Sequence, residues 1–170
     1  MIKRLLVIVT WSLVIASTMY LSFPLPKFPQ PPNESLQSGE PADMESIYRR
    51  AYFVNLTRQQ VLDHYQDQYG GLINYRLNYP PEEAYALVRD QTRSSYLEEI
   101  VLPWRGSLFV NGFVPTKPTE QINRNGVHYL AKVTVRFAPS HFVVRLTTLG
   151  MTALIGYFLV KEYVDEIRFA

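Results

Sequence analysis

The sequence predicts an α+β domain with a small, mostly antiparallel sheet of about five strands and two helices on one face, flanked by an N-terminal and a C-terminal transmembrane helix. Three observations predict this class. Nearly unbroken apolar runs occupy residues 5–23 and 142–160. Between them, several segments alternate apolar and polar residues, as half-buried strands do. Two segments with apolar residues at helical spacing lie among the strands, which is an α+β order of elements.

The N-terminal run has the length and the flanks of a membrane helix. Residues 5–23 carry no charge and follow Lys3 and Arg4, and about 20 apolar residues cross a hydrocarbon core of roughly 30 Å. Basic residues stay on the cytoplasmic side, so we expect the N-terminus inside and the middle of the chain outside. A cleavable signal peptide with a small-residue site near Ala16 is the alternative. Because apolar residues continue well past that site, we assign residues 1–23 to a retained anchor.

A proline-rich linker is predicted over residues 24–43. Its prolines are Pro24, Pro26, Pro29, Pro31, Pro32 and Pro41. This spacing excludes helix and sheet and favours extended polyproline II structure, with about 3.1 Å per residue. We interpret the segment as a stiff stalk, and a proline-rich recognition motif is the alternative interpretation.

The predicted domain, residues 44–140, begins with a strand over residues 51–56 and a helix from Thr57. Gln60 lies three residues after Thr57, which is the spacing of a capping box. One stripe at helical spacing contains Val61, Leu62, Tyr65 and Tyr69. The glycines that follow, Gly70 and Gly71, predict the end of this helix.

A second strand and a second helix are predicted next. Ile73, Tyr75, Leu77 and Tyr79 alternate with polar residues, so we expect one buried and one wet face. Prolines and acids at residues 80–83 are typical of a helix start. We expect this helix to run to about Arg93, with an apolar face made by Ala84, Leu87 and Val88.

Three further strands complete the predicted sheet. Residues 96–102 fit either a helix or a strand, and we favour a strand because a turn at residues 103–106 leads into an apolar partner at 107–113. Prolines at 115 and 118 predict a loop, and Asn125-Gly126 predicts a tight turn. Residues 127–137 alternate most regularly and predict a long last strand.

The second apolar run predicts a second transmembrane helix over residues 141–162, followed by a short cytoplasmic tail at 163–170. Arg145 lies near its start, where a long side chain can reach the interface. A buried helix of the domain is the alternative, but it would need a polar face. Small residues recur at Gly150, Ala153 and Gly156 and would let another helix approach closely.

The composition argues against several kinds of partner and site. The net charge is +2, but residues 24–141 hold twelve basic and twelve acidic residues, so we expect no nucleic-acid partner. The chain has no cysteine, which excludes disulfides and thiolate chemistry. The histidines, His64, His128 and His141, lack ligand spacing, so we predict no metal, no cofactor and no catalytic residue.

Two groups of residues are candidates for other roles. On a strand, one of the neighbours Glu98 and Glu99 points to the buried face, where we expect an ion pair with a cation such as Arg105. Tyrosine combines an apolar ring with a hydroxyl and suits contact surfaces. The tyrosines outside the predicted core are Tyr48, Tyr52, Tyr85 and Tyr96.

These observations lead to an expected function. We expect a membrane-anchored, extracytoplasmic interaction or assembly subunit without catalysis, with both termini cytoplasmic and a bacterial plasma membrane as the default location. Its partners would be the lipid bilayer and another membrane protein or further copies of itself. The alternatives are a tyrosine-lined binding module for a small apolar or carbohydrate ligand, and an enzyme with a dispersed site using Glu98 or Glu99 with His128.

Overall fold

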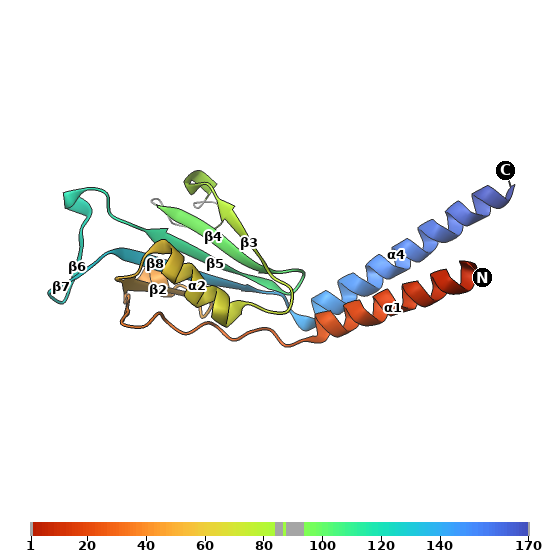
Figure 1. The fold of residues 1–170 in the computed structure, drawn as a ribbon, viewed down its shortest axis with the longest axis horizontal. Helices are drawn as coiled ribbons and strands as arrows, with labels where there is room; N and C mark the ends of the chain where they lie inside the picture. Colours follow the sequence, from red (N-terminus) through yellow and green to blue (C-terminus); the bar gives the residue numbers. More distant parts are fainter. Residues whose placement is uncertain (1, 84–86, 88–93, 170) are drawn as a thin grey trace. The chain divides into compact units, whose positions relative to one another are not determined.

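The computed structural model describes residues 2–83, 87 and 94–169. The chain divides into two compact units. Residues 26–139 form an α+β unit, and residues 1–25 together with 140–170 form a helical unit (Figure 1). The α+β class and the mostly antiparallel sheet are confirmed. The α+β unit begins at Pro26, whereas the sequence places its start at Met44.

The α+β unit is built on a six-stranded sheet in which all neighbouring strands are antiparallel. Its order is β1 (Leu36–Gln37), β2 (Arg49–Val54), β8 (Ala131–Pro139), β5 (Gly106–Phe113), β4 (Tyr96–Leu102) and β3 (Tyr75–Tyr79). A two-stranded hairpin of β6 (Ile122–Arg124) and β7 (Val127–Tyr129) lies beside it. Short 3₁₀ turns are η1 (Pro41–Met44), η2 (Pro81–Glu83) and η3 (Pro118–Glu120).

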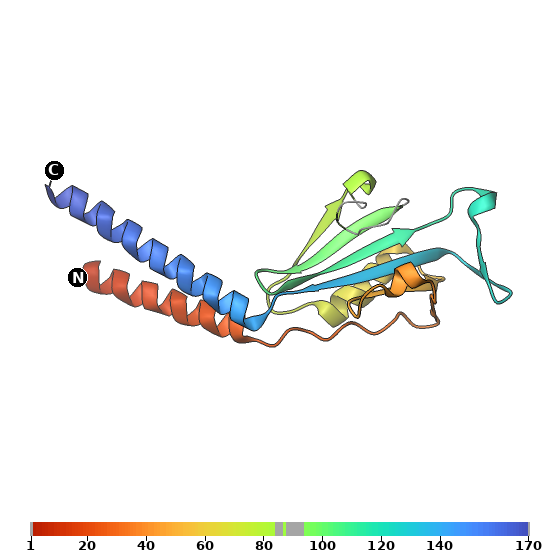
Figure 2. The ribbon, with the colours of Figure 1, turned by 180° about the vertical axis from the view of Figure 1, so that it is seen from behind.

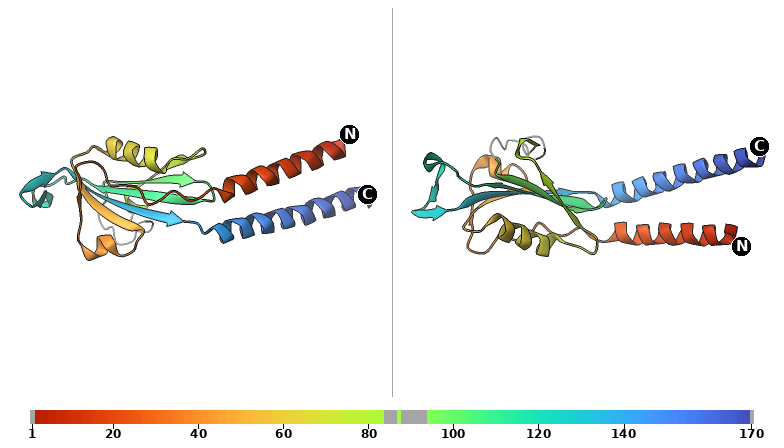
Figure 3. Two further views of the ribbon diagram at one scale, coloured as in Figure 1. Left: turned by 90° about the horizontal axis from the view of Figure 1, so that it is seen from below. Right: turned by 45° about the horizontal axis from the view of Figure 1, so that its top comes forward.

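Helix α2 (Arg58–Tyr69) covers one face of this sheet, and η1 lies on the other (Figure 3, left). The predicted capping box is present: the Thr57 hydroxyl accepts from the Gln60 N–H, and the Gln60 side chain accepts from the Thr57 N–H. The predicted stripe of Val61, Leu62, Tyr65 and Tyr69 is buried. Tyr69 packs edge-on against Phe137 of β8, with ring centroids 5.7 Å apart. The helix therefore buries its apolar side against the sheet.

A glycine ends α2 because of a close approach rather than a left-handed backbone. Gly70 has φ −55° and its N–H donates to Gln66 O at 2.7 Å. A Cβ at Gly70 would overlap that same Gln66 oxygen. Any other residue would have to move the last turn of the helix.

The buried face predicted for β3 is wrong. Tyr75 and Leu77 are exposed, and Tyr79 is half-buried. The strand order explains this, because β3 is an edge strand and α2 lies on the other side of the sheet from these side chains. By register, Leu77 shares its face with Glu99, Phe109 and Arg136.

The long last strand predicted over residues 127–137 is two strands in the structure. β7 ends at Tyr129 and β8 begins at Ala131, and Leu130 N donates to the Asn55 side chain and to the Val54 backbone. The predicted turn at Asn125-Gly126 is confirmed, with φ 52° and 76°. Another tight turn joins β4 to β5, where Trp104 also has a positive φ of 57°.

The proline-rich segment contains regular structure and contacts the domain. Leu36–Gln37 pairs with β2, and Gln30 N donates to the Gln68 side chain of α2 at 2.7 Å. Pro41 starts η1, where its missing N–H costs nothing. The expectation that this spacing excludes sheet is therefore wrong for the two residues of β1.

The second predicted helix, over residues 80–93, falls mostly outside the described residues. The structure describes Pro81–Glu83 as a 3₁₀ turn and Leu87 as helical, and it does not describe residues 84–86 and 88–93. Leu87 and Phe109 pack against Leu97, and the Leu87 carbonyl accepts from Arg136. These residues lie on the face of the sheet away from α2, so the expectation of two helices on one face is wrong for the one described residue of the second helix.

The helical unit consists of α1 (Ile2–Ser22) and α4 (Phe142–Phe169), which lie side by side and antiparallel (Figures 1 and 2). Arg145 is buried near the start of α4 and donates to the Phe23 carbonyl at 3.2 Å. Among the described residues, one helix is long and apolar enough to cross a membrane, namely Phe142–Val164. The apolar part of α1, Ile8–Ser22, is shorter.

Candidate functional site

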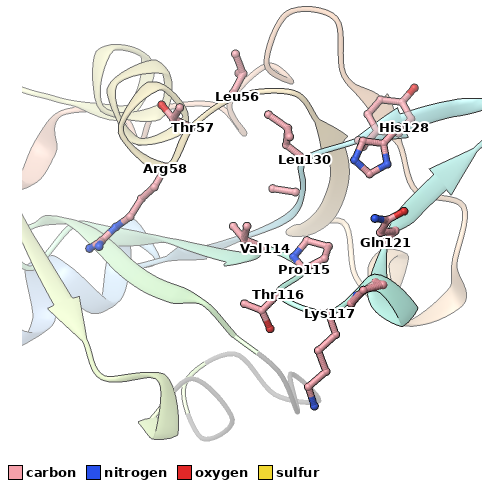
Figure 4. Close-up of a pocket in the computed structure, with 13 residues that line it drawn as sticks. Leu56, Thr57, Arg58, Val114, Pro115, Thr116, Lys117, Gln121, His128 and Leu130 are labelled. Atoms are coloured by element: carbon pink, nitrogen blue, oxygen red, sulfur yellow. The ribbon is translucent and has the colours of Figure 1, made fainter.

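A cleft of about 490 Å³ opens at one end of the α+β unit (Figure 4). Three segments form its walls: the start of α2 at residues 56–58, the loop after β5 at 114–118, and the junction of β7 and β8 at 128–131. The capping box fixes the first wall, and the loop prolines Pro115 and Pro118 restrict the second. The cleft is thus built from rigid local structures.

The lining of the cleft is mostly apolar, with basic groups at its rim. Val114, Pro115 and Leu130 lie around its centre in Figure 4. None of the thirteen described lining residues is acidic, whereas Arg58 and Lys117 are basic. The His128 ring contacts the Asn123 side chain at 3.1 Å. The arrangement suits an apolar group in the centre of the cleft, with cations near its rim.

A buried carboxylate lies next to this cleft. Glu98 of β4 is 1 % exposed. Its Oε1 accepts from Arg58 Nε at 2.7 Å and also contacts Arg58 Nη2, and its Oε2 lies 2.9 Å from Arg76 Nε. One carboxylate thus faces two guanidiniums, and the group of three side chains carries a net positive charge.

Residue spacing does not identify Arg58 and Arg76 as the partners of Glu98. The sequence did contain one indication that Arg58 has an anionic partner. A cation at the first position of a helix interacts unfavourably with the helix dipole, and a nearby anion offsets this. Arg105, the partner considered from the sequence, is buried in the turn between β4 and β5. Glu99 is buried on the opposite face and accepts a hydrogen bond of 2.6 Å from the Tyr79 hydroxyl.

Hydrogen bonding and burial shift the pKa values of several tyrosines. The hydrogen bond to Glu99 raises the pKa of Tyr79 to about 12, with burial adding to it. Burial raises the pKa of Tyr65, of Tyr96 and of Tyr52. Neutral phenols therefore pack beneath α2, which is what a core requires.

The tyrosines proposed as a contact surface separate into different environments. Tyr52 and Tyr96 are 3 % and 4 % exposed, so they belong to the core and not to a contact surface. The Tyr96 ring fills the space over Gly112, where a Cβ would overlap it. Tyr48 is exposed at one edge and packs against Phe137. Tyr85 lies outside the described residues.

The small residues of α4 face open space in this structure. A Cβ added at Gly150 or at Gly156 would meet nothing within 4 Å, and Ala153 is exposed. The three residues are therefore brought together on the helix, but within the described chain nothing packs closely against the two glycines.

The histidines remain separate from one another. His64 on α2 contacts the Gln30 carbonyl and the Gln68 side chain, and His141 precedes α4, where its ring contacts Val143 N. No group of three or more His, Asp or Glu side chains that could hold a metal is found in the part of the chain that the structure describes.

Comparison with known proteins adds no relative: no family model, curated protein or solved structure matches this chain. The candidate roles therefore rest on the residues and their geometry.

Proposed function

We propose that the chain is a membrane-anchored interaction or assembly subunit, with two spans, cytoplasmic termini and an α+β domain outside the cytoplasm. The domain serves as a binding surface and has no catalytic role of its own. The membrane in question is a plasma membrane of the bacterial type.

The observation that carries the proposal is the uncovered apolar surface of α4. The stretch Phe142–Val164 has 23 residues, and only 6 % of its most apolar window is buried. Exposing so much apolar surface to water is costly, at about 25 cal/mol per Å². A lipid bilayer and the helices of partner proteins remove that cost, and the stretch is long enough for a span.

The antiparallel arrangement of α1 and α4 supports a hairpin of two spans. The hydrogen bond from Arg145 to the Phe23 carbonyl connects the end of α1 to the start of α4. Two antiparallel spans return the chain to the side on which it started. Lys3 and Arg4, before the first apolar run, favour the cytoplasm for that side.

Single cysteines test this topology, because the natural chain has none. Gly39→Cys is the external site, since Gly39 is exposed and an added Cβ meets nothing within 4 Å. Its neighbour Ser38 is only 2 % exposed and is unsuitable. On intact cells an impermeant maleimide labels Gly39→Cys and does not label Ala170→Cys until the membrane is opened. Labelling of both sites on intact cells would contradict two spans.

The assembly role is tested by native mass spectrometry of the tagged full chain in mild detergent. We expect a stoichiometric partner protein or a defined oligomer. The double variant Gly150→Leu and Gly156→Leu fills the open space on α4 and should reduce that complex. Met151→Leu, on the same helix and of similar volume, is the matched control. An intact complex in the double variant would contradict contact through the glycines, and a bare monomer of the natural chain would contradict the assembly role.

The cleft favours a second candidate function, a binding module for a small ligand with an apolar body. Tyr129 is the single tyrosine among its described lining residues, so the cleft is not tyrosine-lined. Here native mass spectrometry would find an added small mass on the monomer. Leu130→Arg would abolish that mass by filling the cleft, whereas Val127→Arg, on an exposed strand position outside the lining, would keep it.

A further inference from the structure

Three segments meet at one end of the sheet. This is the end at which β8 finishes. Leu102 pairs with Gly106 at the turn between β4 and β5, and Gly106 pairs with Pro139, the last residue of β8. The loop before β3 joins them, because a Cβ at Gly71 would lie 3.2 Å from Leu102 Cδ2. The loop of residues 70–74, the turn of residues 103–105 and the end of β8 therefore share this end.

Apolar side chains at this end are unusually exposed. Leu72 is 95 % exposed and Trp104 is 79 % exposed, more than any other large apolar side chain described in the α+β unit. Ile73, which follows Leu72 in the chain, is 51 % exposed. We call Leu72, Ile73 and Trp104 the Trp104 patch. Exposing large apolar side chains to water is unfavourable, so the patch is a candidate contact surface.

The chain itself limits what can cover the patch. Only Ser140 and His141 separate Pro139 from Phe142, where α4 begins. Three residue steps span at most about 11 Å. If α4 spans a bilayer, Pro139 lies within that reach of the start of the span, and Pro139 is at the end of the sheet that carries the Trp104 patch.

The composition of this end suits a lipid interface. Residues 70–74, 103–105 and 139–141 contain no acidic residue, so no carboxylate would have to leave water. Tryptophan is enriched where bilayers meet water, because its ring is apolar and its N–H is polar. At the other end of the unit the exposed apolar residues lie among charges, for example Val127 in the same hairpin as Arg124.

We infer that the Trp104 patch enters the interfacial region of the bilayer in which α4 is anchored. The occupant of this surface is lipid, and the patch together with α4 fixes the orientation of the domain on the membrane. This inference deepens the proposed function and rests on its anchoring through α4.

Tryptophan fluorescence tests the inference directly. The chain has two tryptophans, Trp11 and Trp104. Trp11→Phe leaves Trp104 as the single reporter in the full chain, reconstituted into phosphatidylcholine vesicles with or without brominated acyl chains. Bromine quenches tryptophan at short range, so we expect a roughly twofold or larger loss of emission in the brominated vesicles for an interfacial ring.

A matched reporter at the other end of the unit provides the control. The triple variant Trp11→Phe, Trp104→Phe and Val127→Trp places the tryptophan on β7, before the nine residues of β8. A strand of that length spans roughly 26 Å at about 3.3 Å per residue. Its emission should be equal in both kinds of vesicle. In the Trp11→Phe chain, Leu72→Ser should reduce the quenching of Trp104, because it removes the neighbouring apolar anchor.

The outcomes separate the inference from the proposed function. Labelling of Ala170→Cys in the same vesicles reports whether α4 spans. A protected α4 with equal Trp104 emission in both vesicles would overturn the inference and leave the anchoring intact. Trp104 emission that is blue-shifted but not quenched by bromine would also overturn the inference. It would indicate that protein, rather than lipid, covers the patch. Failure of the chain to reconstitute through α4 would overturn both.

Discussion

Helices α2 and α4 use similar apolar residues in opposite ways. In α2 the apolar residues form one stripe, and Val61, Leu62, Tyr65 and Tyr69 are all buried against the sheet. In α4 apolar residues surround the helix, and almost none of the stretch Phe142–Val164 is buried. The apolar side of α2 is covered by its own chain, whereas that of α4 needs an environment that the chain does not supply.

The charged residues near the starts of α2 and α4 also contact different kinds of partner. α2 begins with Arg58, whose guanidinium binds the buried Glu98 of β4 and so fixes the helix on the sheet. α4 has Arg145, which contacts a backbone carbonyl at the end of α1. In this chain, the distribution of apolar residues around a helix, rather than their number, distinguishes the core helix α2 from the apolar helix α4.

The largest expected effect comes from removing a core side chain of α2. Leu62→Ala should lower the free energy of unfolding of the domain by about 2–5 kcal/mol, since it leaves a cavity under the helix. Denaturant titration of the full chain in detergent measures this. The matched variant Leu154→Ala on α4 should leave the unfolding of the domain unchanged. Equal shifts for the two variants would remove the distinction between the helices.

A charge placed on each helix distinguishes the environments of α2 and α4. Leu154→Lys should cost membrane insertion about 2.5–3.5 kcal/mol, because it places an ammonium near the centre of the span. Asp67→Lys, on the exposed side of α2, should change stability by no more than about 0.5 kcal/mol. Alkaline extraction of membranes compares the inserted fractions. A Leu154→Lys chain that stays fully in the membrane pellet would argue against a span.

Next in size is the loss of the anion that fixes α2. Glu98→Gln should destabilise the domain by about 1–3 kcal/mol, less than for a fully buried pair because Arg58 and Arg76 reach solvent. Asp67→Asn is the control, since Asp67 is an exposed acid on α2. Thermal unfolding followed by circular dichroism should separate the two variants, and equal melting temperatures would contradict a structural role for Glu98.

The smallest expected effect lies on the sheet edge, outside both helices. The hydrogen bond to Glu99 raises the pKa of Tyr79 to about 12, above the ordinary value of 10. The protonated phenol is thus favoured in the folded state, and its contribution to stability is complete below pH 10 and is lost as pH rises through 12. Tyr79→Phe should remove that contribution, and ultraviolet titration of the two proteins should differ by one late-ionising phenol. Identical titrations would contradict this.

Local sequence patterns predict which helices, strands and turns form. They predict less well what packs against each of those elements. The capping box, the strand at residues 96–102 and the turn at Asn125-Gly126 follow from a few adjacent residues, and all three are present. The buried face of β3 was predicted from alternation alone. Alternation reports that one side is apolar, but the strand order decides whether anything covers it.

Contacts between distant residues were not predictable from spacing. Arg58 and Glu98 lie forty positions apart, and nothing in either segment specifies the other. The cleft depends on three separate segments meeting, and its loop residues carry no motif. The short strand β1 escaped prediction because two residues between prolines give no periodicity, although their backbone groups pair with β2.

The position of β8 has a mechanical consequence. β8 lies between β2 and β5 and leads within three residues into α4. A force pulling on α4 along β8 acts across both hydrogen-bonded ladders at once, because ladder bonds are perpendicular to the strands. A force pulling on α1 instead reaches the sheet at β1, an edge strand of two residues that pairs only with β2. The domain should therefore resist load from its C-terminal side and yield from its N-terminal side.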